Sequence, residues 1–312
     1  MAIPVSSPYQ QYSGSPSNYI PKIYAKKVRL RYWETSVLPA ITNTDYSGNI
    51  MDQGDEVIIR TSPDITIDDY HKGDTFTYES IRSDSISLLI DKAKKYSFRV
   101  DAIDEKQADI VLDKTFVENS ARGMTETIET AFFADIYNDG SSSNYGATAG
   151  YRTSGFNLGA SGAPVLLNKG NITDQLTDLK TVLTEYKIPD DMKRWIVLPP
   201  WATGLIDKSD IKNCSFSGED KSRAFKNKYV ATIAGFNVYE SNQLSTAADG
   251  SGVTATNIVF GHKDAICFVT QLVKNESVKL ESTFGTGYKG LQVYGYRVVQ
   301  PTALGWLYAA KG

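Results

Sequence analysis

Residues 55–90 carry the pattern of a long β-hairpin, and this feature constrains the fold more than any other in the sequence. Two arms rich in Ile, Val, Thr and aromatic residues flank a polar tip; the first arm holds residues 56–60 and 65–67, the return arm residues 76–78 and 86–90, and the tip residues 68–75. Arms of roughly a dozen residues would each reach about 40 Å at about 3.3 Å per residue. A two-stranded ribbon with polar side chains on both faces is marginal in water by itself. We therefore expect the hairpin to lie on another surface, with a second copy of the chain as the first candidate.

The composition sets broad limits on the class of protein. A chain of 312 residues is expected to form one or two domains with extensions. The net charge of -3 gives no global attraction to nucleic acid or to an anionic membrane. Cys214 and Cys267 stand in unrelated contexts, so we expect a reducing compartment and no disulfide framework. Because no run of about 18 apolar residues occurs, no membrane span is predicted.

The N-terminal residues divide into two parts. Residues 1–21 contain prolines and few large aliphatic side chains, a composition that predicts a flexible arm. Residues 22–31 interleave apolar residues with basic ones, and the basic residues at the end of this run are Lys26, Lys27, Arg29 and Arg31. Such a run can contact phosphates. Because the whole chain is slightly acidic, we favour a solvated or inter-subunit surface instead.

The longest helix signal covers about residues 104–137. Its apolar residues recur at four-residue steps or multiples of them: Leu112, Phe116, Met124, Ile128, Phe132 and Ile136. At 1.5 Å per residue such a helix is about 50 Å long, which is long for a routine helix of a compact domain. Gly123 costs about 1 kcal/mol relative to Ala in a helix interior, so we expect a bend or close packing there.

The rest of the chain reads as a mixture of helices and strands without an internal repeat. A second helix is predicted at residues 172–186, with Asn171 as its candidate cap. Residues 195–198 form a predicted buried strand that ends at Pro199 and precedes a short helix. The later strands are predicted at residues 229–233, 234–239, 258–260, 265–269, 278–280, 291–299 and 303–309.

Residues 285–290 match the glycine pattern of a dinucleotide-binding fingerprint. That fingerprint needs a strand before it and a helix after it. A strand-like stretch follows here, so we interpret the glycines as a turn and expect no cofactor.

No pattern of titratable residues predicts catalysis or metal binding. His71 and His262 are the only histidines, and no His/Cys cluster has metal-ligand spacing. The acidic pairs at residues 68–69 and 190–191 are interpreted as solvated or capping residues. No nucleophile-elbow string occurs, so no catalytic residue is expected.

The order of these elements resembles that of the major capsid proteins of tailed bacteriophages, whose fold is named after the phage Hong Kong 97. A basic arm, a long two-stranded loop, a long helix, a mixed α/β region and a terminal β segment follow one another in the same order. Four strings look like characteristic junctions of that fold: residues 96–109, 195–200, 234–244 and 287–301. The resemblance extends over nearly the whole chain from about Lys22.

The resemblance implies an α+β fold divided as in that family. The expected parts are an N-terminal arm at 1–35, an E-loop at 54–95, a first part of the P-domain at 36–53 and 96–170 with its spine helix at about 104–137, an A-domain at 171–256, and return strands of the P-domain and A-domain at 257–312.

The resemblance also implies a structural subunit of a virion. Hexamers and pentamers of it would close into an icosahedral shell around double-stranded DNA, assembled in the host cytoplasm. The expected partners are other copies, a separate scaffolding protein and a portal protein, with non-specific DNA contact and no membrane, cofactor or enzymatic activity. The expected inter-subunit contacts are Asp68, Asp69, Tyr70, His71, Lys72 and Asp74 of the tip, and Lys26, Lys27, Arg29 and Arg31 of the arm.

Two features of some family members are not expected here. Some members cross-link an E-loop lysine to a neighbour's asparagine; Lys72 lies at the predicted tip, but no asparagine follows Asn275. Some members begin with a cleaved scaffolding segment, whereas the arm here starts almost at Met1. We therefore expect a scaffold encoded separately.

Three other interpretations remain at this point. An encapsulin, which is a bacterial shell around cargo enzymes, shares the fold and would copurify with cargo protein instead of DNA. A β-rich tail or adhesion module would use the Tyr-rich surface as a binding face, but the long helix argues against it. An unrecognised hydrolase has no supporting motif.

Overall fold

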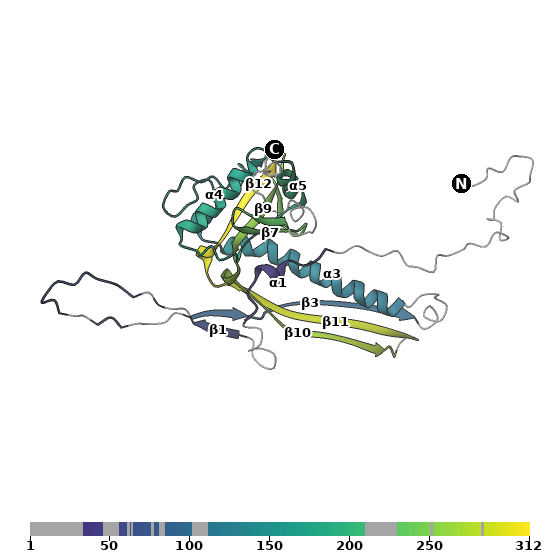
Figure 1. Ribbon diagram of the computed structural model, residues 1–312. Helices are drawn as coiled ribbons and strands as arrows, with labels where there is room; N and C mark the ends of the chain where they lie inside the picture. Colours follow the sequence, from purple (N-terminus) through teal and green to yellow (C-terminus); the bar gives the residue numbers. More distant parts are fainter. Residues whose placement is uncertain are drawn as a thin grey trace, which may run out of the picture.

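The computed structural model describes residues 34–45, 56–60, 63, 65–75, 78–80, 85–101, 112–209, 230–249, 252–281 and 284–312. Figure 1 shows the arrangement of the helices and strands. The α-helices are α1 Leu38–Ile41, α3 Leu112–Asp135, α4 Ile172–Glu185 and α5 Pro200–Lys208. The short 3₁₀ helices are η2 Ile136–Asp139, η3 Ser142–Asn144, η5 Lys263–Ala265 and η6 Pro301–Ala303.

The strands form a two-stranded, a three-stranded and a seven-stranded sheet. The two-stranded sheet pairs β1 Glu56–Arg60 with β2 Ser85–Leu89, and the three-stranded sheet has the order β10 Ile266–Lys279, β11 Gly285–Val298, β3 Lys92–Asp101. The seven-stranded sheet has the order β4 Val165–Leu167, β12 Leu304–Lys311, β9 Thr254–His262, β5 Arg194–Leu198, β7 Phe236–Glu240, β6 Val230–Ile233, and β8 Thr246–Ala248 also pairs with β9.

The seven-stranded sheet is covered on both faces, and its central strand β5 shows how. All five residues of β5 are buried. Ile196 and Leu198 pack with α4 and α5, whereas Trp195 and Val197 pack with α1 and α3 on the other face. Successive side chains of a strand point to opposite faces, so a strand between two layers of helices must be apolar throughout. The layers lie in this order in Figure 1, with α4 and α5 above the sheet and α3 below.

The three-stranded sheet extends beyond the seven-stranded sheet along α3 (Figure 1). β10 and β11 are an antiparallel pair of 14 residues each, and β3 pairs antiparallel with β11. α3 is held to this sheet by a polar triad: Lys92 Nζ lies 3.1 Å from Asp135 Oδ2, and the Tyr296 hydroxyl donates to the same oxygen at 2.8 Å. Burial raises the pKa of the Tyr296 phenol to about 12, so the hydroxyl remains a donor at neutral pH.

The predicted hairpin is present, but its strand ladder is much shorter than expected. β1 and β2 have five residues each, and residues 65–67, predicted as a strand, are not one. The prediction of arms of about a dozen paired residues was therefore wrong. Pro63 lies just beyond β1, and a proline has no N–H to donate to a ladder.

The long helix is confirmed, with different limits. α3 ends at Asp135 and continues into η2, and the predicted residues 104–111 lie outside the described part of the chain. Met124, Ile128, Phe132 and Ile136 form the buried stripe that the periodicity predicts. Phe116 departs from it, because it is 42% exposed and contacts the Phe98 ring edge-on at 6.0 Å. Because Phe98 belongs to β3, this contact joins the N-terminal half of α3 to the three-stranded sheet.

The predicted glycine turn needs correction, because the glycines of residues 285–290 lie inside strand β11. Asn171 occupies the N-cap position of α4, as predicted, but its side chain makes no capping hydrogen bond. Its amide oxygen accepts from the Asn168 N–H, and its amide nitrogen donates to the Leu166 carbonyl. β4 belongs to the seven-stranded sheet through its parallel pairing with β12.

Candidate assembly surfaces

The base of the hairpin is fixed to the chain's own three-stranded sheet. Ile59, Leu88 and Ile90 form a buried cluster with Cys267 and Val269 of β10. The backbone of β2 approaches so closely that a Cβ on Gly295 of β11 would lie 2.2 Å from the Leu89 carbonyl oxygen. This contact requires a glycine, because a real Cβ is essentially never found so close to a backbone atom.

The hairpin tip is solvent-exposed throughout residues 65–75. The His71 N–H donates to Asp74 Oδ2 at 2.7 Å, the Asp74 N–H donates to the His71 carbonyl at 3.0 Å, and Gly73 has a φ of +105°. These bonds form one tight turn over residues 71–74, which holds the predicted contact residues His71, Lys72 and Asp74. The other predicted contact residues of the tip, Asp68, Asp69 and Tyr70, precede this turn and are exposed. Ile67 is 93% exposed in the same segment. The tip therefore offers acidic and apolar groups together.

The other predicted contacts belong to the basic arm. Lys26, Lys27, Arg29 and Arg31 lie outside the described residues, which begin at Glu34.

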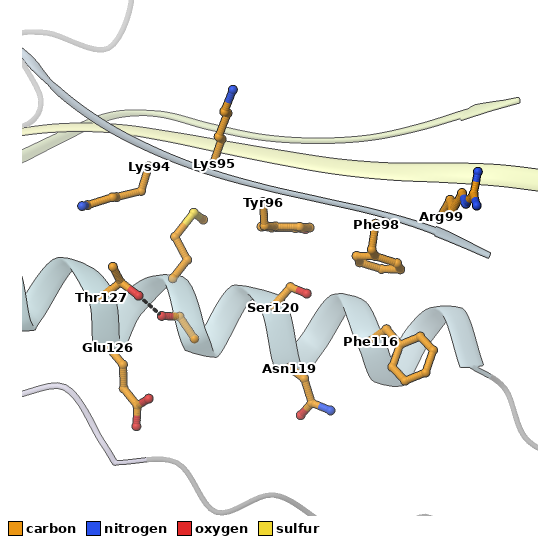
Figure 2. Close-up of a pocket in the computed structure, with 12 residues that line it drawn as sticks. Lys94, Lys95, Tyr96, Phe98, Arg99, Phe116, Asn119, Ser120, Glu126 and Thr127 are labelled. Carbon is orange, nitrogen blue, oxygen red and sulfur yellow. Dashed lines mark hydrogen bonds between the residues drawn. The ribbon is translucent and has the colours of Figure 1, made fainter. Parts of the chain in front are cut away.

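The three-stranded sheet has an exposed basic surface that sequence reasoning missed. Lys95 and Arg99 point away from α3 in Figure 2, opposite to Tyr96 and Phe98. Residues paired across antiparallel strands share a face. The surface, which we call the distal face, therefore consists of three cross-strand rows: Lys95–Leu291–Lys274, Ser97–Lys289–Glu276 and Arg99–Gly287–Val278.

The distal face carries four cations: Lys95, Arg99, Lys274 and Lys289. Its rows contain one carboxylate, Glu276, and Asp101 lies at the end of the face as a second acid. Glu276 lies 2.6 Å from Lys274 Nζ and 2.9 Å from Lys289 Nζ. These two ammonium groups lower the pKa of Glu276 to about 2, so its charge persists at any physiological pH. Two hollows of about 430 and 550 Å³ lie over this face and have both apolar and cationic walls.

The distal face continues the surface on which the hairpin base lies. Under the hairpin base lie Val269, Val293 and Gly295. They are on the same face of the sheet as Leu291 and Lys289, which lie farther along β11. One face of the sheet is thus apolar and covered near the hairpin, and basic and exposed at the far end. Only the strand register reveals this, because each row joins a residue of β3 to residues that lie 179 to 196 positions later in the sequence.

A groove of about 680 Å³ lies on the other face of the sheet, between β3 and α3. Tyr96 and Phe98 point from the strand toward the helix, where Ser120 and Phe116 lie along the same groove (Figure 2). The Tyr96 ring also covers Gly290 of the neighbouring strand, and its hydroxyl donates to Asn275 Oδ1 at 3.0 Å. The lining of this groove thus combines three aromatic rings with polar residues of α3 and with the cations of β3: Lys94, Lys95 and Arg99.

The first described residues are fixed to α3 and to the loop after β7. The buried Glu129 carboxylate accepts from the Val37 N–H at 3.3 Å and from the Ser241 hydroxyl at 3.0 Å. The Glu34 carboxylate accepts from the Asn242 N–H at 3.0 and 3.1 Å. Burial raises the pKa of Glu129. This joint connects the entry of the chain, the long helix and the seven-stranded sheet.

Three further titratable groups in the described part of the chain have structural partners: His262, Asp190 and Arg194. The His262 Nε2 lies 2.9 Å from Asp191 Oδ1, and Asp190 pairs with Lys180 at 3.0 Å. The buried Arg194 guanidinium donates to the carbonyls of Ile188 and Pro189 and to the Thr184 hydroxyl. These bonds fix the loop between α4 and β5.

Among the described residues, no three His, Cys, Asp or Glu side chains are placed to hold a metal ion. Within the same residues, no helix is both long and apolar enough to cross a membrane.

Comparisons with known proteins agree on one class. The model of a family described as phage capsid protein matches residues 60–311. A structure from Mycobacterium phage Che8 has 21% identity and a TM-score of 0.72, covering 94% of this chain and 98% of that one. The capsid structure of the cyanophage P-SCSP1u has 14% identity and a TM-score of 0.69, covering 94% of each chain. The mature capsid of bacteriophage PhiM1 has 14% identity and a TM-score of 0.64, covering 98% of this chain and 99% of that one. No curated protein sequence matches this chain.

Proposed function

The chain belongs to the phage capsid protein family and is a major capsid protein of the Hong Kong 97 fold, and from this premise we propose how its copies assemble. The predicted family, fold class, capsid role and virion location are confirmed. We propose that hexamers and pentamers of the chain close into an icosahedral shell around double-stranded DNA. We further propose that assembly takes place in the host cytoplasm with a separate scaffolding protein and a portal protein. In this proposal the chain catalyses no reaction.

The domain division is proposed with one change. We propose an E-loop, a P-domain around α3 and the three-stranded sheet, and an A-domain around the seven-stranded sheet. Because β4 and β12 pair within the seven-stranded sheet, we place both with the A-domain.

We propose that the hairpin tip of one subunit lies on the distal face of its neighbour. The exposed acidic and apolar tip is the observation that carries this proposal. Charge complementarity supports it, since Asp68, Asp69 and Asp74 would meet the four cations of the distal face. The continuity of the distal face with the surface under the hairpin base is a second support.

Charge reversal tests this contact. The double substitution Lys95→Glu with Lys289→Glu should prevent shell formation at low salt, and adding Asp68→Lys with Asp69→Lys should restore it. Lys169→Glu, an exposed lysine in the turn before α4, is the matched control and should assemble normally. Electron microscopy and sedimentation give the measurement. Normal assembly of the double variant, or failure of the rescue, would refute this contact.

The capsid assembly itself is tested with unmodified protein. Light scattering and negative-stain microscopy, with and without scaffold, should detect capsomer rings or megadalton shells. A stable inert monomer under all conditions would contradict the proposed assembly. On a denaturing gel, mature shells should migrate as monomer, because no cross-link through Lys72 is expected; a ladder of bands would show that it forms.

A further inference from the structure

Strand β3 lies at the edge of the three-stranded sheet, and its outer side is open. β3 pairs with β11 on one side, and no strand among the described residues pairs with its other side. No backbone hydrogen bond from elsewhere in the described chain reaches that side either. Every second residue of such a strand points its N–H and C=O groups outward, so the edge of β3 can accept a further strand.

The groove between β3 and α3 contains this open edge. Tyr96 and Phe98 point toward the helix, whereas Lys95 and Arg99 point away from it (Figure 2). Residues of both kinds nevertheless line the same groove of about 680 Å³. Because successive side chains of a strand point to opposite faces, a space that touches both faces runs along the side of the strand. The groove therefore has the position of a fourth strand of the sheet.

The charge of the groove selects the kind of strand that fits. Lys94, Lys95 and Arg99 of β3 line it, and Glu126 is the single acidic residue in its lining. Lysines on an edge strand discourage pairing with neutral or basic strands. A strand that adds here must supply carboxylates opposite these cations and apolar side chains opposite the two rings.

Residues 65–69 of the hairpin have this composition and lack a strand partner in the described part of the chain. Their sequence is Ile-Thr-Ile-Asp-Asp, and β-branched residues favour strands. Ile65 is 62% exposed and Ile67 is 93% exposed. The Thr66 N–H lies 3.4 Å from Glu79 Oε2, and no backbone hydrogen bond joins residues 65–69 to the rest of the described chain.

One antiparallel register matches all five residues of this segment to β3. Its pairs are Ile65–Phe98, Thr66–Ser97, Ile67–Tyr96, Asp68–Lys95 and Asp69–Lys94. Both isoleucines then lie with the rings on the side of α3, and Thr66 lies on the side of the distal face. A shift of one residue would exchange the two sides. A shift of two residues in either direction would remove the charge pairs with Lys94 and Lys95.

The direction of the hairpin points to a second copy as the source of this strand. The hairpin and the three-stranded sheet project in opposite directions in Figure 1, so a subunit does not bring its own tip to its own groove. β1 runs toward the tip, and β3 runs toward the opposite end of the molecule. In copies arranged head to tail, the arriving segment therefore runs antiparallel to β3.

We propose that residues 65–69 of one subunit add to β3 of its neighbour as an antiparallel fourth strand in this register. The inference rests on the hairpin docking proposed above and gives its chemistry. Main-chain hydrogen bonds along the open edge hold the segment, and side chains at alternate positions make it specific. Asp68 and Asp69 set the register against Lys95 and Lys94.

A disulfide between subunits tests the register. In a Cys214→Ser background, Thr66→Cys is combined with Ser97→Cys, the residue opposite it. Cys267 is retained, because it is 2% exposed and burial raises the pKa of its thiol to about 11. Directly opposite residues of antiparallel strands have Cβ atoms about 4.5–5.5 Å apart, whereas diagonal neighbours lie about 7–8 Å apart, which is too far for a disulfide.

Oxidised shells of this pair should give covalent oligomers on a denaturing gel. The matched control, Thr66→Cys with Arg99→Cys, places the second cysteine two residues away on the same side of β3 and should give about tenfold less product. Equal yields from the two pairs, or assembled shells of the first pair without the disulfide, would overturn the register.

Hydrogen exchange of the unmodified protein gives an independent measurement. On assembly, the amides of residues 65–69 and of alternate residues in 94–98 should exchange about tenfold slower or more, because they enter a strand ladder. Protection of residues 65–69 together with the edge of β10 instead of β3 would refute this edge, and unchanged rates in both segments would refute strand addition.

The two levels of the proposal fail differently. If the unmodified protein forms neither rings nor shells under the microscope, the assembly itself is refuted, and strand addition with it. Shells that form without the disulfide and without the protection would refute strand addition alone.

Discussion

Substituting Gly295 with alanine should release the hairpin base from the sheet while leaving the sheet intact. The added Cβ would lie 2.2 Å from the Leu89 carbonyl oxygen and 3.1 Å from Ile90 Cα. Both are backbone atoms, so no change of rotamer relieves the contact. Gly295 itself is held by its pairing with Val269 of β10. The hairpin base must therefore move outward by about 1 Å, since real Cβ contacts closer than 3.0 Å essentially never occur.

The magnitude follows from what that movement separates. A gap of 0.5–1 Å removes roughly a quarter to a half of each dispersion contact in the cluster of Ile59, Leu88 and Ile90 with β10. Overpacking of this kind typically costs about 1–3 kcal/mol. At about 2 kcal/mol, the amides of β1 and β2 should exchange with solvent about 30-fold faster.

Native-state hydrogen exchange measures this directly. Gly204→Ala is the matched control, because nothing lies within 4 Å of its new Cβ in α5 and helix propensity favours alanine. Unchanged exchange in β1 and β2 of Gly295→Ala would refute the close-approach argument. Equal acceleration in β10 and β11 would show that the substitution disrupts the sheet rather than the hairpin.

Three further substitutions test the interior polar contacts. The raised pKa of Glu129 means that the folded state binds its proton more tightly than the unfolded state. The free energy of unfolding of wild type, relative to that of Glu129→Gln, should therefore fall as the pH rises above about 4.5. Urea unfolding measures this difference, and a difference that does not change with pH would contradict the explanation. Tyr296→Phe should lower the free energy of unfolding by about 1 kcal/mol at neutral pH in the same assay. Its absorbance titration should lack the phenol ionisation with a pKa of about 12 that the wild type shows, and a titration identical to wild type would be inconsistent with this assignment. Arg194→Lys should reduce the free energy of unfolding by about 3 kcal/mol, because the three acceptors are met by three different nitrogens of the planar guanidinium, and a lysine has a single nitrogen. Arg297→Lys on the surface should be neutral, and equal effects of the two substitutions would sink this explanation.

Local sequence patterns predicted the elements in which apolar residues recur at a regular spacing because they face the same core. The four-residue spacing from Met124 to Ile136 identified the buried stripe of α3, because one face of that helix meets one core. The apolar run of β5 predicted a strand buried on both sides for the same reason. Phe116 keeps the spacing and yet lies outside the stripe; its ring contacts Phe98 of the three-stranded sheet and is 42% exposed.

Contacts between distant residues could not be predicted from local patterns. The distal face exists only once Lys95 and Leu291 are paired, and nothing near either residue specifies that register. The Glu129 joint depends on Val37 and Ser241, which are 92 and 112 positions away. The glycines of β11 resembled a turn in the sequence. Glycine is needed there because Tyr96 and the backbone of β3 approach closely, and that contact lies on another strand.

The hairpin has the mechanics of a cantilever. Its root is clamped at Gly295 by backbone contact and a small apolar cluster, and its tip extends into solvent. A force applied at the tip of such a beam acts on the clamp with the full leverage of the beam's length. β11 runs from the clamp to the distal face of the same subunit, and β10 accompanies it with a bulge between Thr270 and Leu272. In the ring of subunits proposed above, tension on one hairpin would therefore be transmitted along these strands to the surface that we propose receives the next hairpin.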